Sequence, residues 1–257
     1  MTVNSYLGTL ASDLVVRDTE REKINRSVGA IKFRLENYFG DEISDILLFG
    51  SYTRGTILPR SVDPNSDIDI MVVFPNVYGY KPQTFLDKLK RFAEYWYPNS
   101  TVAQSRPSIV LKLEHIKFEI TPAHTCFANS YYIPKDRSSW QTTNPNGFND
   151  SLIKCNEKNS YKIKPVIRLM KLWNFKLNDG DLPSFELEKK ISENLEYAYL
   201  NCTSYCDYLK EAFSAIKWHT NWNKVDDAVR RINKALENEA NGLPYSAELE
   251  IAKVFPE

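Results

Sequence analysis

Cysteine and histidine are scarce in this chain, with four and three copies among 257 residues. Small secreted domains are held together by densely spaced cysteines, so the count excludes a disulfide framework of that kind. Cys202 and Cys206 are four residues apart and could share a helical face, with His219 downstream. A structural zinc ion needs four ligands, and no second pair lies nearby, so we expect buried thiols there.

Long apolar runs are also missing. No stretch approaches the roughly 20 consecutive apolar residues that cross a bilayer. The first residues, MTVNSYLGTLASDLVVRDTEREK, lack the basic segment and apolar core of a secretory signal peptide. We therefore expect a cytoplasmic protein with no membrane partner.

Neither sign of charge is in excess, since Lys+Arg and Asp+Glu both total 33. A surface that binds long nucleic acid is usually basic, so this balance disfavours such a partner but allows a small basic pocket. The apolar fraction of 42% is that of a globular protein. The length allows one large domain or two modest ones.

Hydrophobic periodicity divides the chain into a mixed first part and a helical second part. The first part has a predicted helix over 3–38, with room for a break, and the second begins near residue 161. The other expected elements of the first part are strands over 43–49, 67–74, 108–114 and 116–121, a helix over 83–97 and a long loop over 122–150. The expected helices of the second part cover 161–177, 184–200, 205–218 and 224–240.

The segment DIDIMVVF (67–74) places two carboxylates on one face of a strand. Side chains alternate along a strand, so Asp67 and Asp69 point one way while Ile68 and Ile70 point into the core. Two neighbouring carboxylates repel each other unless a cation lies between them. Mg²⁺ and Mn²⁺ are hard cations that would relieve this repulsion.

The segment FEI repeats this arrangement on a later strand, with Glu119 between two apolar residues. Three carboxylates from two adjacent strands could hold two metal ions, as in in-line displacement at phosphorus. Alone, an Asp-x-Asp pair is more often a solvated strand edge. It indicates a metal site only in combination with the other motifs nearby in the sequence.

Gly50 and Ser51 end the first predicted strand. A helix that begins here would point free N–H groups at a bound phosphate. The segment lacks the Gly-Lys-Ser/Thr of a P-loop, and a lone Gly-Ser is usually a turn. Together with the carboxylates, however, it predicts a metal site beside a triphosphate.

The segment LLFGSYTRGTILPRSVDPNSDIDIMVVF (47–74) resembles the signature of polymerase-beta-type nucleotidyltransferases, Gly-Ser followed by Asp-x-Asp. It further resembles the branch that contains the bacterial cGAS/DncV-like (CD-NTase, or SMODS) cyclic oligonucleotide synthases, in which Gly-Thr follows the Gly-Ser. Four further segments resemble that branch: FEITPAH, YYIPKDRSSWQTTNPNGF, VIRLMKLWN and LPSFELE. The likeness extends from about residue 43 to residue 190.

The resemblance implies an α+β fold with a nucleotidyltransferase core (1–160) containing a mixed sheet, and a helical C-terminal lobe (161–257) like that of oligoadenylate synthase. It also implies the roles of five residues in the core. Gly50 and Ser51 would hold the donor phosphates, and Asp67, Asp69 and Glu119 would be the catalytic metal ligands.

The resemblance assigns two more residues, Lys171 and Ser184, to the triphosphate. Without it, Lys171 would be interpreted as part of a solvated helix face and Ser184 as a helix N-cap.

The chain departs from the family pattern in two places. Glu119 stands where bacterial relatives usually have aspartate, and its side chain is one methylene longer, which would change the position of one metal. Fifteen residues separate Ser51 from Asp67, which is long for the superfamily. The SVDPN segment is interpreted as an insertion, so we assign Asp63 to a loop.

The implied activity is nucleotidyl transfer with two Mg²⁺ or Mn²⁺ ions, using ATP or other NTPs as substrates. The product would be a cyclic or linear oligonucleotide messenger in bacterial antiphage (CBASS) defence, with a protein activator or effector as a further partner. The alternatives are an enzyme that modifies a protein or tRNA, and a nucleotide-binding homologue with little catalysis. Neutral charge disfavours tRNA, and the 122–150 and LPSFELE segments favour the messenger synthase.

Overall fold

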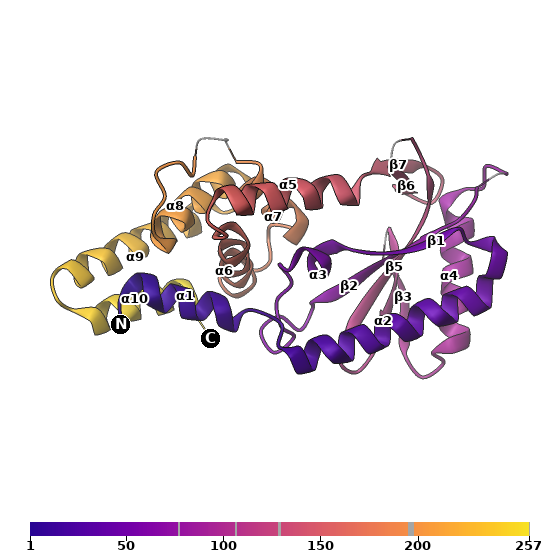
Figure 1. Cartoon of the computed structure of the whole chain (residues 1–257), viewed down its shortest axis with the longest axis horizontal. Helices are drawn as coiled ribbons and strands as arrows, with labels where there is room; N and C mark the ends of the chain where they lie inside the picture. The colour runs from indigo at the N-terminus through magenta and orange to yellow at the C-terminus, as the bar shows by residue number, and fades with distance from the viewer. Residues whose placement is uncertain (77, 106, 128–129, 195–197, 257) are drawn as a thin grey trace. The chain divides into compact units, whose positions relative to one another are not determined.

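The computed structural model describes residues 1–76, 78–105, 107–127, 130–194 and 198–256 (Figure 1). The chain forms two compact units, which we name the sheet unit and the helical unit. The sheet unit contains Val16–Arg60 and Pro64–Asn149, and the helical unit contains Met1–Val15, Ser61–Asp63 and Asp150–Glu257. The division into domains at 1–160 and 161–257 stays a prediction. The two compact units of the structure are divided at different residues.

The sheet unit is built on a mixed sheet. The strands are β1 (Asp45–Phe49), β2 (Asp67–Val73), β3 (Thr101–Ser105), β4 (Ser108–Lys112), β5 (Lys117–Thr125), β6 (Tyr131–Pro134) and β7 (Trp140–Thr143). Their order is β1-β2-β5-β4-β3, and β6 pairs with both β5 and β7. Strands β2 and β5 run parallel, whereas the other paired strands are antiparallel. The predicted mixed sheet is therefore confirmed.

One face of this sheet is covered by two helices, α2 (Asp18–Phe39) and α4 (Pro82–Trp96), as Figure 1 shows. The apolar residues of α2 that recur at helical spacing are buried and pack in one core with Ile68 and Ile70 of β2: Ile24, Val28, Ile31 and Leu35. Helix α2 ends at Phe39, and its C-cap residue, Gly40, has a φ of +50°. The opposite face of β2 presents Asp67 and Asp69 at the start of the strand, whereas Met71 and Val73 further along that face are buried in a second, small core cluster.

Two sequence predictions for the sheet unit are corrected by the structure. The predicted long loop over 122–150 is wrong, because this region contains the end of β5, the β6–β7 hairpin and the beginning of α5 (Pro145–Lys158). Its many Pro, Asn, Ser and Thr residues concealed two four-residue strands, which are too short for a clear alternation. Residues 128 and 129 lie outside the described part of the chain. Strand β3 was also not predicted.

The N-terminal region and the helical unit agree better with the predictions. The 3–38 region is divided into α1 (Val3–Asp13) and α2, with a break of four residues. The further helices are α6 (Ile163–Lys176), α7 (Ser184–Ser192), α8 (Tyr205–Ile216), α9 (Trp222–Ala240) and α10 (Pro244–Val254). Helix α7 ends before the predicted residue 200, and residues 195–197 of that prediction lie outside the described residues. Helix α10 was not predicted. Among the residues described, no helix is long and apolar enough to cross a membrane.

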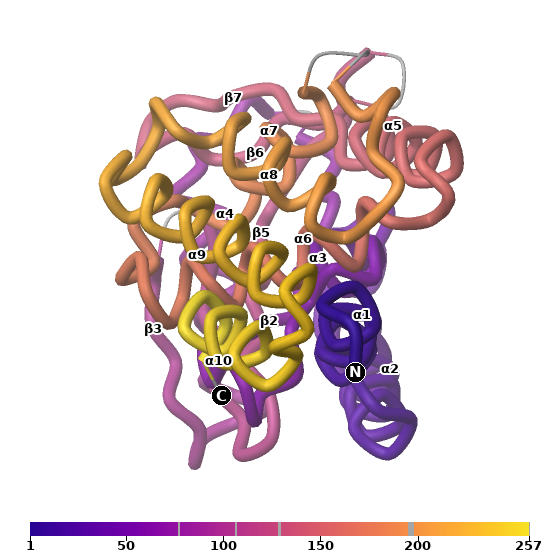
Figure 2. The backbone as a smooth tube through the Cα atoms, turned by 90° about the vertical axis from the view of Figure 1, so that its left-hand side faces the viewer, coloured from indigo at the N-terminus to yellow at the C-terminus, as the bar shows by residue number. Residues whose placement is uncertain are grey.

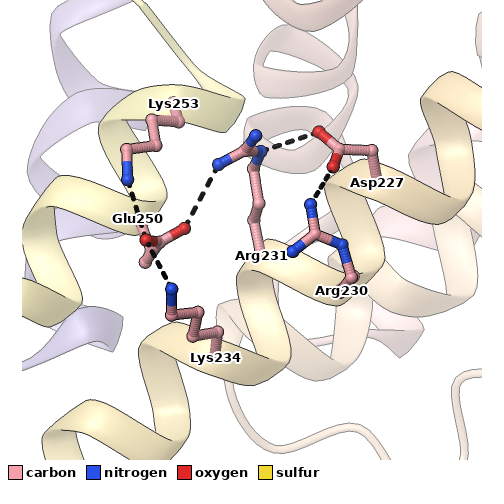
Figure 3. A network of polar contacts seen from close by, with 6 residues as sticks. All are labelled: Asp227, Arg230, Arg231, Lys234, Glu250 and Lys253. Atoms are coloured by element: carbon pink, nitrogen blue, oxygen red, sulfur yellow. Dashed lines mark hydrogen bonds and ion pairs between the residues drawn. The ribbon is translucent and has the colours of Figure 1, made fainter.

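Helices α9 and α10 lie side by side in the helical unit (Figure 2). Glu250 of α10 accepts contacts from Lys253 at 2.8 Å and from Arg231 and Lys234 of α9 at 3.3 Å (Figure 3). The side chain of Glu250 is only 7% exposed. The contact with Lys253, followed by those with Lys234, holds the pKa of Glu250 below its ordinary value. The ionised carboxylate therefore joins the two helices.

We expect Glu250→Gln to lower the free energy of unfolding by about 1–3 kcal/mol at pH 7, since a charge-assisted acceptor is lost. Because the pKa of Glu250 is lowered on folding, this stabilisation is present above the ordinary value of 4.5 and disappears as the pH falls through the lowered pKa. Urea unfolding of both proteins at pH 7 and pH 3 measures it. An equal difference at the two pH values would contradict the electrostatic origin.

Candidate active site

Gly50 lies directly against the carboxylate of Asp69. Strand β1 ends at Phe49, which is paired with Asp69 of β2, and the short helix α3 (Gly50–Arg54) begins at the next residue. Gly50 has a φ of +79°, and a Cβ atom at this position would lie 1.7 Å from Oδ2 of Asp69. Only glycine fits this position, because the backbone conformation and the close approach both exclude a side chain.

The Gly50–Ser51 turn is held by its own backbone. The Ser51 carbonyl accepts N–H groups from Thr56 at 3.0 Å and Ile57 at 3.2 Å. The Gly50 carbonyl accepts the hydroxyl of Thr53 at 2.9 Å. These hydrogen bonds fix the backbone that follows β1. They therefore hold Ser51 in place next to Gly50, which contacts Asp69.

The three carboxylates share one face of the sheet, as predicted. Ile68 and Ile70 are fully buried under the helices, while Asp67 and Asp69 are half-buried on the other face. Strand β5 repeats this pattern around the half-buried Glu119. The parallel register places Asp69 directly beside Glu119, so the three residues lie on one face of two neighbouring strands, with Gly50 against Asp69.

Sequence analysis missed Lys117, which belongs to the same site. The register pairs it with Asp67, and its Nζ lies 2.9 Å from Oδ2 of Asp67 and 3.4 Å from Oε1 of Glu119. A signal was present in the sequence, since residues 117 and 119 share a face of one strand. Their pairing with Asp67 depends on the parallel register, which the sequence does not show.

The carboxylates and Lys117 alter each other's protonation. Burial and then the charge of Asp67 raise the pKa of Glu119, although Lys117 acts in the other direction. Burial lowers the pKa of Lys117, but the hydrogen bond to Asp67 and both carboxylate charges outweigh it, and the net shift of this pKa is upward. Lys117 is therefore a firmly charged ammonium, and the site is one that attracts cations.

The donor atoms suit a hard divalent cation. Three carboxylates offer oxygen ligands of the kind that Mg²⁺ and Mn²⁺ prefer, and an ammonium already bridges two of them. In this arrangement, no group of three Cys, His, Asp or Glu side chains within the described ranges is gathered closely enough to enclose a metal ion. Asp67, Asp69 and Glu119 are the residues that would hold it, after an adjustment of their side chains.

Lys171 and Ser184, the two other predicted residues, lie in the helical unit. Lys171 of α6 is 6% exposed and forms an ion pair of 2.5 Å with Glu188 of α7, which is fully buried. Its interpretation as a solvated helix face is therefore wrong. Ser184 is exposed and is the first residue of α7, whose N-cap is Pro183, so the N-cap interpretation is also wrong.

Asp63 and the cysteines were set aside by the sequence analysis. Asp63 lies in the loop between α3 and β2, as predicted. Cys202 is half-buried and Cys206 is buried, and both are free thiols. Burial raises the pKa of Cys206 to about 12, which favours the protonated thiol over the thiolate that a zinc ion would bind.

Comparison with known protein families shows to which family the chain belongs. Residues 1–156, more than half of the sequence, match the family model of the Second Messenger Oligonucleotide or Dinucleotide Synthetase domain. The chain belongs to this family. The matched residues include the Gly50–Ser51 turn and all three carboxylates of the site. No curated protein sequence matches the chain.

Solved structures show that this synthetase domain has the fold of bacterial nucleotidyltransferases. It is similar to Vibrio cholerae DncV cyclic AMP-GMP synthase in complex with a linear intermediate (TM-score 0.76, 11% identity, 96% of this chain and 93% of that one). It is also similar to E. coli MS115-1 CdnC with ATP (TM-score 0.73, 16% identity, 99% of both chains). Elizabethkingia meningoseptica CdnE cyclic dinucleotide synthase with GTP and Apcpp gives a TM-score of 0.68 at 18% identity over 85% and 84% of the chains. The predicted α+β, polymerase-beta-like fold class is confirmed.

Proposed function

We propose that the protein is a metal-dependent nucleotidyltransferase that makes a cyclic or linear oligonucleotide messenger from NTPs. One observation carries the proposal: Gly50 is in contact with Asp69, on the sheet face that also presents Asp67 and Glu119. This arrangement would place a phosphate-binding turn next to a cation-binding group of carboxylates. Membership of the synthetase family supports it.

The residues of the sheet unit would divide the work of binding. The backbone N–H groups and hydroxyl of the Gly50–Ser51 turn would contact the phosphates of the donor NTP. Asp67, Asp69 and Glu119 would hold one or two divalent cations. When bound, such ions lower the pKa of the attacking ribose hydroxyl and neutralise the charge of the departing pyrophosphate.

The reaction would join an acceptor ribose oxygen to the α-phosphorus of the donor and release pyrophosphate. The protein contributes mainly by positioning both groups and by fixing charge around them. Glu119 would be the carboxylate nearest the acceptor hydroxyl, and its extra methylene relative to aspartate changes how far it reaches. A second transfer within a linked dinucleotide would close the ring.

Two residues of the helical unit, Lys171 and Ser184, would contact the triphosphate. Ser184 is exposed at the start of α7 and has a hydroxyl to donate. Lys171 is charged but paired with Glu188, so its contact with phosphate would require exchange of partners or sharing of the ammonium. The pair also holds the Lys171 side chain in one place.

Similar solved structures support the class of substrate and partner. The CdnC structures contain ATP in one case and a HORMA-deltaN complex in another. The CdnE structure contains GTP and Apcpp. We propose NTP substrates, a protein activator or effector, a cytoplasmic location and a role in antiphage defence for the present chain.

A nucleotide-binding homologue with little catalysis is a second candidate. Lys117 forms ion pairs with two of the three carboxylates. In addition, Glu119 stands at the position where aspartate is usual. Both features would reduce metal-dependent transfer and leave nucleotide binding intact.

Mass spectrometry of reaction products tests the proposal. The purified protein is incubated with all four NTPs and either Mg²⁺ or Mn²⁺, beside the variant Asp69→Asn. We expect a cyclic or linear oligonucleotide from the unmutated protein and none from the variant, because the variant loses a charged metal ligand. Nucleotide binding without product under both metals would favour the second candidate. Transfer to an added protein or tRNA would instead identify a macromolecular acceptor.

A further inference from the structure

Lys117 lies where a cation is needed by the three carboxylates. Its Nζ is 2.9 Å from Asp67 and 3.4 Å from Glu119, and the parallel register aligns it with Asp67 along the sheet. The three side chains are each about a quarter exposed, at 24%, 28% and 26%. The ammonium is thus held among the proposed ligands and is not directed into open solvent.

The charges of this group explain why a lysine can be accommodated there. Asp67, Asp69 and Glu119 together carry three negative charges when ionised, and the ammonium of Lys117 neutralises one of them. Without it, the half-buried carboxylates would repel each other. An ammonium and a divalent ion cannot both use the same oxygens of Asp67 and Glu119, because like charges a few ångströms apart repel strongly.

We propose that Lys117 is an internal counter-cation that occupies Asp67 and Glu119 in the metal-free enzyme and competes with the divalent ion for them. The inference rests on the proposed function, since it takes these carboxylates to be the metal ligands. Lys117 is a positioning residue in this scheme. Its flexible four-carbon side chain lets the ammonium leave when the metal ion binds.

Competition predicts that the nucleotide-free protein binds divalent ions more weakly than its carboxylates alone would allow. Removing the ammonium should therefore strengthen metal binding. It should also weaken the metal-free fold, because Asp67 and Glu119 then lose their ion pairs with Lys117.

Electron paramagnetic resonance of Mn²⁺, in the absence of nucleotide, measures the first effect. We expect Lys117→Gln to bind Mn²⁺ about tenfold more tightly than the unmutated protein, equivalent to about 1.4 kcal/mol. Lys117→Met, which keeps an unbranched side chain only one atom shorter, is made in parallel in case one variant does not fold. Lys117→Arg retains the positive charge and should not bind more tightly.

Lys112→Gln is the matched control. Lys112 is exposed on the neighbouring strand β4 and is paired in register with Lys117. The control removes the same unit charge from the adjacent position, so it reports the general electrostatic effect. We expect less than a twofold change in Mn²⁺ affinity.

Thermal unfolding gives a second measurement. Lys117→Gln should melt at a lower temperature than the unmutated protein without metal, and saturating Mn²⁺ should raise its melting temperature by more. Equal or weaker Mn²⁺ binding by both uncharged variants would overturn the role of Lys117 and leave the proposed function standing. If no variant binds Mn²⁺, the metal site itself is refuted, and both proposals fall.

Discussion

Gly50→Ala should reduce product formation by about 100-fold or more while leaving most of the fold intact. The new Cβ atom would lie 1.7 Å from Oδ2 and 2.6 Å from Cγ of Asp69, so the carboxylate or the turn must move by more than 1 Å. A displacement of that size at a reacting centre costs about 100-fold in rate. Steady-state rates of pyrophosphate release, with saturating Mg²⁺ and NTPs, measure the effect.

Two glycines provide controls that separate the possible causes. Gly40 also has a positive φ, but a Cβ there has no neighbour within 4 Å, so Gly40→Ala tests backbone strain alone. Gly29 is exposed within α2, and Gly29→Ala should stabilise the protein by about 0.5–1 kcal/mol. Both controls should retain their rates. If Gly40→Ala loses activity as severely as Gly50→Ala, contact with Asp69 is not the cause.

Glu188→Gln should lower the free energy of unfolding by about 3–5 kcal/mol, the largest effect on stability that we expect. Glu188 is fully buried and Lys171 is 6% exposed, so the substitution leaves an ammonium without its counter-charge in the interior of the helical unit. Urea unfolding followed by circular dichroism measures the loss.

A surface pair at the end of the same helix, where Glu193 is the C-cap of α7, is the matched control. Lys189 and Glu193 lie 3.9 Å apart and are about half exposed, at 52% and 49%. Glu193→Gln should change stability by less than about 0.5 kcal/mol, since water screens such pairs. The double variant Lys171→Met/Glu188→Leu should recover most of the stability, because an apolar pair needs no counter-charge. If Glu188→Gln is as mild as Glu193→Gln, the buried pair does not stabilise the unit.

Local patterns were sufficient to predict much of the candidate site. Alternation along β2 and β5 correctly placed Asp67, Asp69 and Glu119 on the face opposite the buried isoleucines. The Gly-Ser pair after the first strand correctly marked the start of a helix. These features depend on residues that are close together in the sequence, so the period of the side chains is enough to find them.

What the sequence did not reveal depends on residues far apart in the chain. The contact of Gly50 with Asp69 and the pairing of Lys117 with Asp67 both follow from strand register, which no local pattern specifies. The burial of Lys171 follows from the packing of α6 against α7, which the charge of the side chain gave no reason to expect. The β6–β7 hairpin was missed because its strands are short and polar.

The parallel pairing of β2 with β5 also bears on how the chain assembles during synthesis. Asp69 and Glu119 are neighbours in the sheet but are separated by 50 positions along the chain (119 − 69 = 50), so the ribosome makes one well before the other. Such distant pairings form late, because a long segment must first be ordered. The strand that brings the last carboxylate to this crowded place also brings Lys117, two positions ahead of it. In a newly made chain, the ammonium of Lys117 can therefore neutralise part of the charge of these carboxylates before any ion has bound from the surrounding solution.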